Sequence, residues 1–148
     1  MSTSTAPRAP GRLGGLEALQ QVVSQLVLDS ATTYVVAQHL APDHPSLIVE
    51  LLAGATPLRV VSAIDGMTLE PDTIVVGPPN SDLWVDAAAV RMMQPEVRSG
   101  PAPSIDVLFD SLALHWPGRS VAVVLSGTGS DGAEGLRLVR ATGGLTMA

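Results

Sequence analysis

The segment Ser126–Gly132 combines glycines with hydroxyl and carboxylate side chains, which makes it the part of the chain best suited to chemistry. It follows the apolar run Val121–Leu125, which we expect to form a buried strand, and it precedes an expected helix over Ala133–Ala141. A loop in this position places backbone N–H groups and a carboxylate where α/β proteins bind ligands, at the carboxyl end of a strand. Two kinds of site fit the pattern: a phosphate cradle, and the acid half of a hydrolase site.

The phosphate interpretation rests on three glycines. Gly127, Gly129 and Gly132 match the G-x-G-x-x-G fingerprint of dinucleotide-binding domains. However, Asp131 would place a carboxylate in the cradle, where it repels a pyrophosphate. The fingerprint also requires an acidic residue about 20 positions further on, and no residue after Glu134 is acidic. Both observations argue against nucleotide binding.

The hydrolase interpretation makes Asp131 the carboxylate of a catalytic triad. A histidine that acts as general base needs an acceptor on its second ring nitrogen, which fixes the tautomer and stabilises the imidazolium. His39 is the candidate base, because it follows an expected strand over 33–37 and so also comes at a strand end. Two simpler roles stay open. Asp131 can be a helix N-cap, and His39 can be a partly buried histidine with structural hydrogen bonds.

Helical and strand patterns alternate along the chain, which predicts an α/β fold with a parallel sheet. Before the glycine loop, helices are expected at 16–28, 43–53 and 105–116, with Ser104 as the N-cap of the last. Strands are expected at 33–37, 58–62, 73–76, 83–85 and 121–125, with residues 91–94 paired to 83–85 and a final strand from Leu145. Residues 1–11 are rich in Ser, Thr, Ala and Pro and are expected to be a disordered lead.

Composition narrows the class of protein. The 148 residues suit one domain, and 46% apolar against 15% charged residues is typical of a sheet covered by helices. There is no cysteine, which excludes disulfides and thiolate chemistry, and the three histidines lack metal-ligand spacing. We therefore expect no metal and no cofactor. The net charge of −6 argues against nucleic-acid binding, and the lack of a membrane-length apolar run or signal peptide predicts a cytoplasmic protein.

Four segments, taken in their order and spacing, resemble the CheB-type protein-glutamate methylesterase domain of bacterial chemotaxis. They are Gly14–Leu19, Val35–Leu40, Pro103–Ser111 and Leu125–Gly132. The resemblance covers residues 12–148, almost the whole chain. Thr128, which stands where many members have Met, makes the last segment similar to versions fused to a receptor methyltransferase.

The resemblance implies a three-layer α/β fold with a parallel sheet, and a Ser-His-Asp mechanism. The family hydrolyses γ-glutamyl methyl esters on chemoreceptors, releasing glutamate and methanol through an acyl-enzyme. By motif, His39 is the general base and Asp131 the orienting carboxylate. The backbone N–H at Thr128, beside Gly129, takes the oxyanion position. The implied partners are methyl-accepting chemoreceptors and a receptor methyltransferase.

The chain departs from the family motif at the nucleophile. The motif G-x-S-x-G-G has its serine two residues before the paired glycines, where this chain has Arg12. The apolar strand expected before that motif is missing, and the family continues with a further helix and strand where this sequence stops. We therefore expect a domain truncated at both ends, which is either an impaired methylesterase or an inactive module that binds chemoreceptors or signalling partners. A sheet cut in this way exposes apolar surface, which predicts association.

Overall fold

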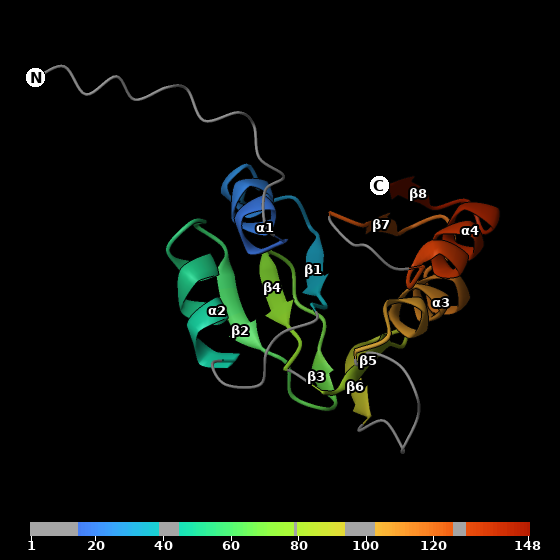
Figure 1. Ribbon diagram of the computed structural model, residues 1–148, viewed down its shortest axis with the longest axis horizontal. Helices are drawn as coiled ribbons and strands as arrows, with labels where there is room; N and C mark the ends of the chain where they lie inside the picture. The colour runs from blue at the N-terminus through green and yellow to red at the C-terminus, as the bar shows by residue number, and fades with distance from the viewer. Residues whose placement is uncertain (1–14, 39–44, 79, 94–102, 126–129) are drawn as a thin grey trace, which may run out of the picture.

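The computed structural model describes residues 15–38, 45–78, 80–93, 103–125 and 130–148 (Figure 1). These residues form four helices and eight short strands, five of which follow one another between the second and third helices. The helices are α1 (Gly15–Ser24), α2 (Pro45–Ala53), α3 (Ile105–His115) and α4 (Ala133–Ala141). The strands are β1 (Thr33–Val36), β2 (Arg59–Ser62), β3 (Met67–Thr68), β4 (Thr73–Val76), β5 (Asp82–Val85), β6 (Ala89–Met93), β7 (Val121–Val123) and β8 (Leu145–Met147).

The central sheet is parallel, with β4 between β1 and β2. All four residues of β4 are buried, as expected for a strand covered on both faces. Ile74 and Val76 face one apolar cluster, which they form with residues of α1 and α2, while Val75 belongs to a second cluster. That second cluster includes Leu108 and Phe109 of α3. The sheet therefore lies between two cores, and the predicted three-layer parallel-sheet α/β fold is confirmed.

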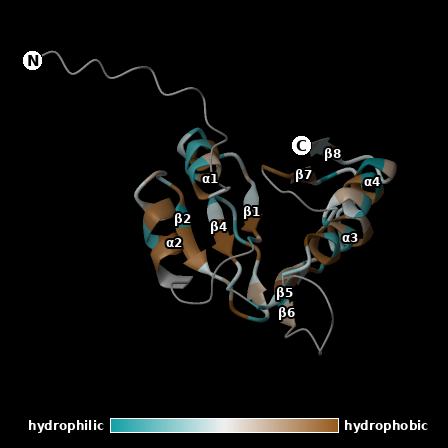
Figure 2. Cartoon of the chain, in the orientation of Figure 1, coloured by the Kyte–Doolittle hydropathy of each residue, from teal (hydrophilic) through white to brown (hydrophobic). Residues whose placement is uncertain are grey.

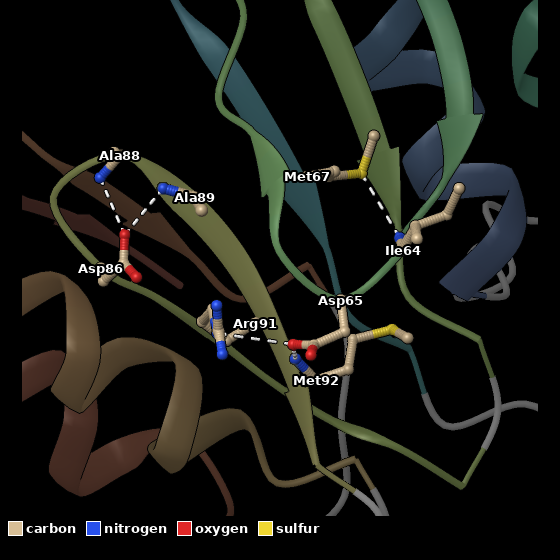
Figure 3. Close-up of polar contacts among 8 residues, drawn as sticks. All are labelled: Ile64, Asp65, Met67, Asp86, Ala88, Ala89, Arg91 and Met92. Atoms are coloured by element: carbon tan, nitrogen blue, oxygen red, sulfur yellow. Dashed lines mark hydrogen bonds and ion pairs between the residues drawn. The ribbon is translucent and has the colours of Figure 1, made fainter.

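An antiparallel ribbon, in the order β3–β6–β5, adjoins the central sheet. Residues 91–93 pair with the strand that ends at Val85, as the sequence predicts. At the tip of the ribbon, Asp86 Oδ1 accepts hydrogen bonds from the backbone N–H groups of Ala88 (2.8 Å) and Ala89 (2.7 Å), shown in Figure 3. These bonds hold the pKa of Asp86 below its ordinary value, because they stabilise the charged form.

The ribbon is also tied to the loop that follows β2. Asp65 Oδ1 accepts from the backbone N–H of Met92 at 3.0 Å and lies 3.5 Å from Arg91 Nε, while Met67 Sδ accepts from the backbone N–H of Ile64 (Figure 3). The Arg91–Asp65 pair is largely exposed, so it contributes little stability by itself. The bond to Met92 and the one from the Gly66 N–H to the Val90 carbonyl oxygen at 2.8 Å set the position of this loop.

β7 and β8 form a separate parallel pair beside α3 and α4 (Figure 1). One face carries Ala122, which is buried in the second core. The opposite face, which we call the apolar sheet face, consists of Val121, Val123, Leu145 and Met147, whose exposed fractions are 51%, 41%, 65% and 55%. Figure 2 shows the apolar character of β7 beside the more polar surface of α4. Among the residues that the structure describes, no strand pairs with the free edge of β1 or of β7.

The observed helices and strands differ from the predicted ones mainly at their ends. The apolar spacing predicts that the first helix continues to Leu28, but α1 ends at Ser24, and Val27 and Leu28 are exposed. The reason is a long-range contact: the Asp72 carboxylate accepts from the backbone N–H groups of Asp29 and Ser30. These bonds turn the chain into β1. None of the helices in the described part of the chain has the length and apolarity to cross a membrane.

Candidate active site

Of the residues that the sequence assigns to the site, the structure describes Asp131. His39, Arg12, Thr128 and Gly129 lie outside the described residues. The approach of His39 to Asp131 therefore stays a prediction, as do the oxyanion position at Thr128 and the nucleophile position at Arg12. What the structure adds is the environment of the carboxylate.

Asp131 lies between β7 and α4, and both of its carboxylate oxygens are hydrogen-bonded. Oδ2 accepts from the backbone N–H of Ile105 at 2.9 Å, and Oδ1 accepts from that of Asp106 at 3.1 Å. Ile105 and Asp106 are the first two residues of α3, so the carboxylate faces the positive end of that helix. Two bonds, one to each oxygen, fix both the position of the carboxylate and the orientation of its plane.

The simpler prediction, that Asp131 is the N-cap of the helix that follows it, is wrong. The N-cap of α4 is Gly132, which has a left-handed φ of 98° and makes no side-chain cap bond. The φ value explains the glycine, because other residues pay a steric penalty there. Asp131 instead binds the N-terminus of α3, which is 25 residues earlier in the chain.

The N-terminus of α3 has further partners. Ser104 is its N-cap, as predicted, and its hydroxyl oxygen accepts from the backbone N–H of Val107 at 3.3 Å. The backbone N–H of Ser104 donates to Asp82 Oδ1 at 2.7 Å, and Asp82 is buried in β5. With the two bonds to Asp131, every backbone N–H from Ser104 to Val107 has an acceptor. Two carboxylates and one hydroxyl therefore hold this turn.

The N-terminus of α4 is bound in return by α3. Asp106 Oδ1 accepts from the backbone N–H of Gly135 at 2.7 Å. The two helices approach closely at this point, because a Cβ added to Gly135 would lie 2.5 Å from Phe109 Cβ. Glycine is therefore required at this position by packing. The arrangement is reciprocal: α3 binds the carboxylate that precedes α4, and α4 binds a carboxylate of α3.

The surroundings of these carboxylates are acidic. Burial, and next the negative charges of Asp106 and Glu134, raise the pKa of Asp110 above its ordinary value. Glu134 also forms an exposed ion pair with Arg137 at 3.0 Å. Among the described residues, no group of histidine and carboxylate side chains is placed so that it could hold a metal ion.

Sequence reasoning missed the roles of Asp82 and Asp106. Asp106 stands in a segment that carries the family resemblance, and an acidic residue in a first helical turn is a known signal for interaction with the helix dipole. That signal does not reveal the bond to Gly135, which lies in another helix. Nothing in the local sequence points to Asp82, because its partner Ser104 is 22 residues away.

Residues 12–148 match the family model described as CheB methylesterase. The chain belongs to the CheB methylesterase family. The fold agrees, since the chain superimposes on the CheB methylesterase catalytic domain of Thermotoga maritima with a TM-score of 0.85 at 25% sequence identity. That likeness covers 91% of this chain and 74% of the Thermotoga chain.

Curated relatives of this CheB-family chain carry consistent names. A protein-glutamate methylesterase/protein-glutamine glutaminase 3 of Myxococcus xanthus is 41% identical over 134 residues, which are 90% of this chain and 38% of the relative. A protein-glutamate methylesterase/protein-glutamine glutaminase of Treponema denticola is 33% identical over 138 residues, 90% of this chain and 37% of that relative. The chain thus spans about two fifths of the length of these relatives.

Proposed function

We propose that this chain carries the acid–base half of a protein-glutamate methylesterase site, acting on γ-glutamyl methyl esters of chemoreceptors. The proposal rests on the two hydrogen bonds that Asp131 accepts from the N-terminus of α3. Asp131 stands at the position where the family motif has the triad carboxylate. A triad carboxylate must be held rigidly, because it sets the orientation of the imidazole. Membership of the CheB family supports the reaction class.

In the proposed mechanism, Asp131 accepts the N–H of one ring nitrogen of His39. A carboxylate offers about four lone-pair positions, so it can accept an imidazole N–H together with two backbone N–H groups. With a serine at position 12, His39 takes the proton of the serine hydroxyl with its other ring nitrogen as the serine oxygen bonds to the ester carbonyl carbon, and it passes that proton to the methanol that leaves as the acyl-enzyme forms. The backbone N–H of Thr128 donates to the developing oxyanion. Water, deprotonated by His39, then releases the glutamate from the acyl-enzyme.

We also propose that Arg12 occupies the position of the nucleophilic serine and slows this reaction. In a triad hydrolase, loss of the serine costs about 10⁶ in kcat and leaves about 10³–10⁴ over water, which comes from the oxyanion site and binding. Arginine is a bulky cation and cannot act as the attacking hydroxyl. The chain therefore has slow turnover as it stands, and a serine at position 12 restores the faster reaction.

The names of the relatives extend the proposal to a second substrate. They pair methylesterase with protein-glutamine glutaminase. Deamidation is the same acyl transfer with ammonia as the leaving group, so we propose that one site carries out both reactions. As partners we propose chemoreceptors and a receptor methyltransferase, and as location the cytoplasm.

Arg12 also favours an alternative function. A chain that keeps the fold and the bound carboxylate but lacks the attacking serine can bind methylated chemoreceptors or signalling partners without turnover. In that case it competes with an active methylesterase for the same receptor segment.

The test compares methanol release from methylated receptor by the unchanged chain, Arg12→Ser and Arg119→Ser. Arg119 is an exposed arginine in the turn before β7, so its replacement is the matched control. We expect Arg12→Ser to raise the rate at least about 100-fold, within the span that a triad serine supplies, and Arg119→Ser to leave it unchanged. Adding His39→Ala to Arg12→Ser should remove the gain.

Two results would contradict these assignments. An Arg12→Ser chain no faster than Arg119→Ser would show that position 12 is not the nucleophile position. Saturable receptor binding by a chain in which neither variant releases methanol or ammonia would favour the binding module over the enzyme.

A further inference from the structure

We propose that Asp106 is a positioning residue for Asp131. The proposal rests on the proposed function, because it takes Asp131 to be the carboxylate that orients the catalytic histidine. Asp106 makes two hydrogen bonds to the segment that carries Asp131. Its backbone N–H donates to the Asp131 carboxylate, and its side chain accepts from the backbone N–H of Gly135 at the start of α4. The structure assigns no contact with substrate to Asp106.

The hydrogen bonds close a ring between two helix N-termini. From Asp131 the ring passes to the backbone N–H of Asp106, through the Asp106 side chain to the backbone N–H of Gly135, and back along the chain to Asp131. The bond from Ile105 adds a second contact with Asp131. Movement of α4 along or around α3 would therefore strain the bonds on both sides of the ring. The ring fixes Asp131 through α3 and through its own segment at once.

These contacts are more than α3 needs in order to begin. Ser104 already caps the helix through its hydroxyl, and the N–H of Ser104 has Asp82 as its acceptor. Two further carboxylates at the same place, Asp106 and Asp131, repel each other. Each is stabilised by N–H groups of a helix N-terminus. The two N–H groups that bind the Asp131 carboxylate, in addition to the hydroxyl cap of Ser104, fix the orientation of Asp131.

Close backbone packing makes the ring stiff. A Cβ at Gly132 would lie 3.1 Å from Ile105 Cγ2, and one at Gly135 would lie 2.5 Å from Phe109 Cβ. Gly132 is the N-cap of α4 and Gly135 lies in its first turn, so this turn is in near contact with α3 at two places. Catalytic groups need placement to within about 0.5 Å, and a misplacement of about 1 Å can cost 100-fold in rate.

The proposal predicts different effects for two substitutions of Asp106. Asp106→Asn keeps an oxygen that can accept from Gly135, so Asp131 should stay in place. Asp106→Ala removes the acceptor, frees the start of α4 and lets the Asp131 carboxylate move off the two N–H groups. Because the histidine alone is affected, kcat should fall by about 10- to 100-fold while KM stays within about twofold.

The experiment uses the full chain with Arg12→Ser, uniformly labelled with ¹³C and ¹⁵N. NMR measures the couplings across the hydrogen bonds from the Ile105 and Asp106 nitrogens to the Asp131 carboxylate carbon, and methanol release gives kcat and KM. Asp110→Ala is the matched control, because Asp110 is an exposed aspartate one turn further along α3. We expect both couplings in the parent chain, in Asp106→Asn and in Asp110→Ala, and neither in Asp106→Ala. Asp106→Leu, which has nearly the shape of aspartate and no acceptor, replaces the alanine variant if the latter does not fold.

The couplings and the kinetics separate this proposal from the proposed function. Couplings that persist in Asp106→Ala overturn the positioning role, whatever the activity. Couplings that are lost while kcat stays within about twofold show that Asp106 holds Asp131 but overturn the catalytic role of Asp131, and with it the proposed function. If the Arg12→Ser chain releases no methanol, the proposed function fails, and loss of the couplings in Asp106→Ala alone still shows that Asp106 holds Asp131.

Discussion

At the scale of single residues, the aspartates differ in whether backbone N–H groups bind their carboxylates. Asp86 accepts two such groups at the tip of the ribbon, and its pKa is lowered. Asp131 accepts two at the N-terminus of α3. Asp110 lies on the same helix as Asp106 and has a raised pKa, first because of partial burial and then because of Asp106 and Glu134. Of these three aspartates, Asp110 is the one whose charged form is disfavoured.

Asp110→Asn should therefore stabilise the protein at neutral pH. A folded-state pKa raised above 3.8 means that the folded chain binds this proton more tightly than the unfolded chain. The cost of burying the charged carboxylate is therefore absent below pH 3.8, where the group is protonated in both states. It is complete above the folded-state pKa. Because the group is mostly exposed and screened by solvent, we expect a gain of a few tenths of a kcal/mol at pH 7, on the order of an exposed ion pair.

Thermal unfolding of the two chains at pH 7 and near pH 4 checks this expectation. Asparagine has nearly the helix propensity of aspartate, so the difference reports on charge. The Tm of Asp110→Asn should exceed that of the parent at pH 7, and the gap should shrink on acidification. A gap that widens as the pH falls would have the wrong sign.

At the scale of elements, the contact between α3 and α4 positions the candidate site. Gly135 permits this contact, since a Cβ there would meet Phe109 Cβ at 2.5 Å. Gly135→Ala should gain about 1 kcal/mol of helix propensity but lose about 1–3 kcal/mol through overpacking, so we expect net destabilisation. It should also weaken the bond from the Gly135 N–H to Asp106.

Urea unfolding measures the effect, with Gly54→Ala as the matched control. A Cβ at Gly54, directly after α2, would meet its nearest atoms at an ordinary 3.6 Å. We expect Gly54→Ala to lie within about 0.5 kcal/mol of the parent, as surface substitutions usually do. An equal effect at the two glycines would show that the close approach of α3 and α4 is not a constraint.

The sequence predicts elements whose limits are set locally. β4 and α4 have the predicted bounds, Thr73–Val76 and Ala133–Ala141, because a short apolar run and the paired glycines after α4 mark their ends. The two-residue strand β3 was not predicted, since two residues give no periodic pattern. The early end of α1 was not predicted either, because Asp72, which turns the chain there, is over 40 residues away.

The same division holds for the candidate site. The type of residue at position 131 and its place after a strand are sufficient to suggest a functional carboxylate. They do not identify α3 as its partner, because the bonds from Ile105 and Asp106 join segments 25 or more residues apart. Asp82 and Asp106 carry no local signal for their acceptor roles, and only the packing of α3 on β5 and α4 reveals them.

At the scale of the whole molecule, the apolar sheet face of β7 and β8 is the feature that affects behaviour in solution. Parallel strands are normally covered on both faces, whereas Val121, Val123, Leu145 and Met147 are each more than two fifths exposed. Contiguous apolar surface of this kind favours association. We expect the chain to form oligomers as its concentration rises.

Sedimentation velocity over a range of concentrations tests this expectation. Combining Val123→Thr with Leu145→Thr keeps residues that suit strands and should shift the distribution toward monomer. Leu114→Gln is the control, because Leu114 is 73% exposed but lies on α3, away from this face. A parent chain that stays monomeric at every concentration would contradict the association, and an equal shift from Leu114→Gln would contradict its location.

The measurement that tests the central claim most directly is the rate of methanol release by Arg12→Ser with and without Asp131→Asn. Asparagine keeps one of the two acceptor oxygens for the α3 N-terminus, and its amide nitrogen can neither accept the second N–H nor stabilise an imidazolium. The corresponding change in a triad protease lowers kcat about 10⁴-fold. We predict a fall of about 10³–10⁴-fold in kcat with an unchanged fold. A rate within about twofold of the Arg12→Ser chain would contradict the assignment of Asp131 to a hydrolase site.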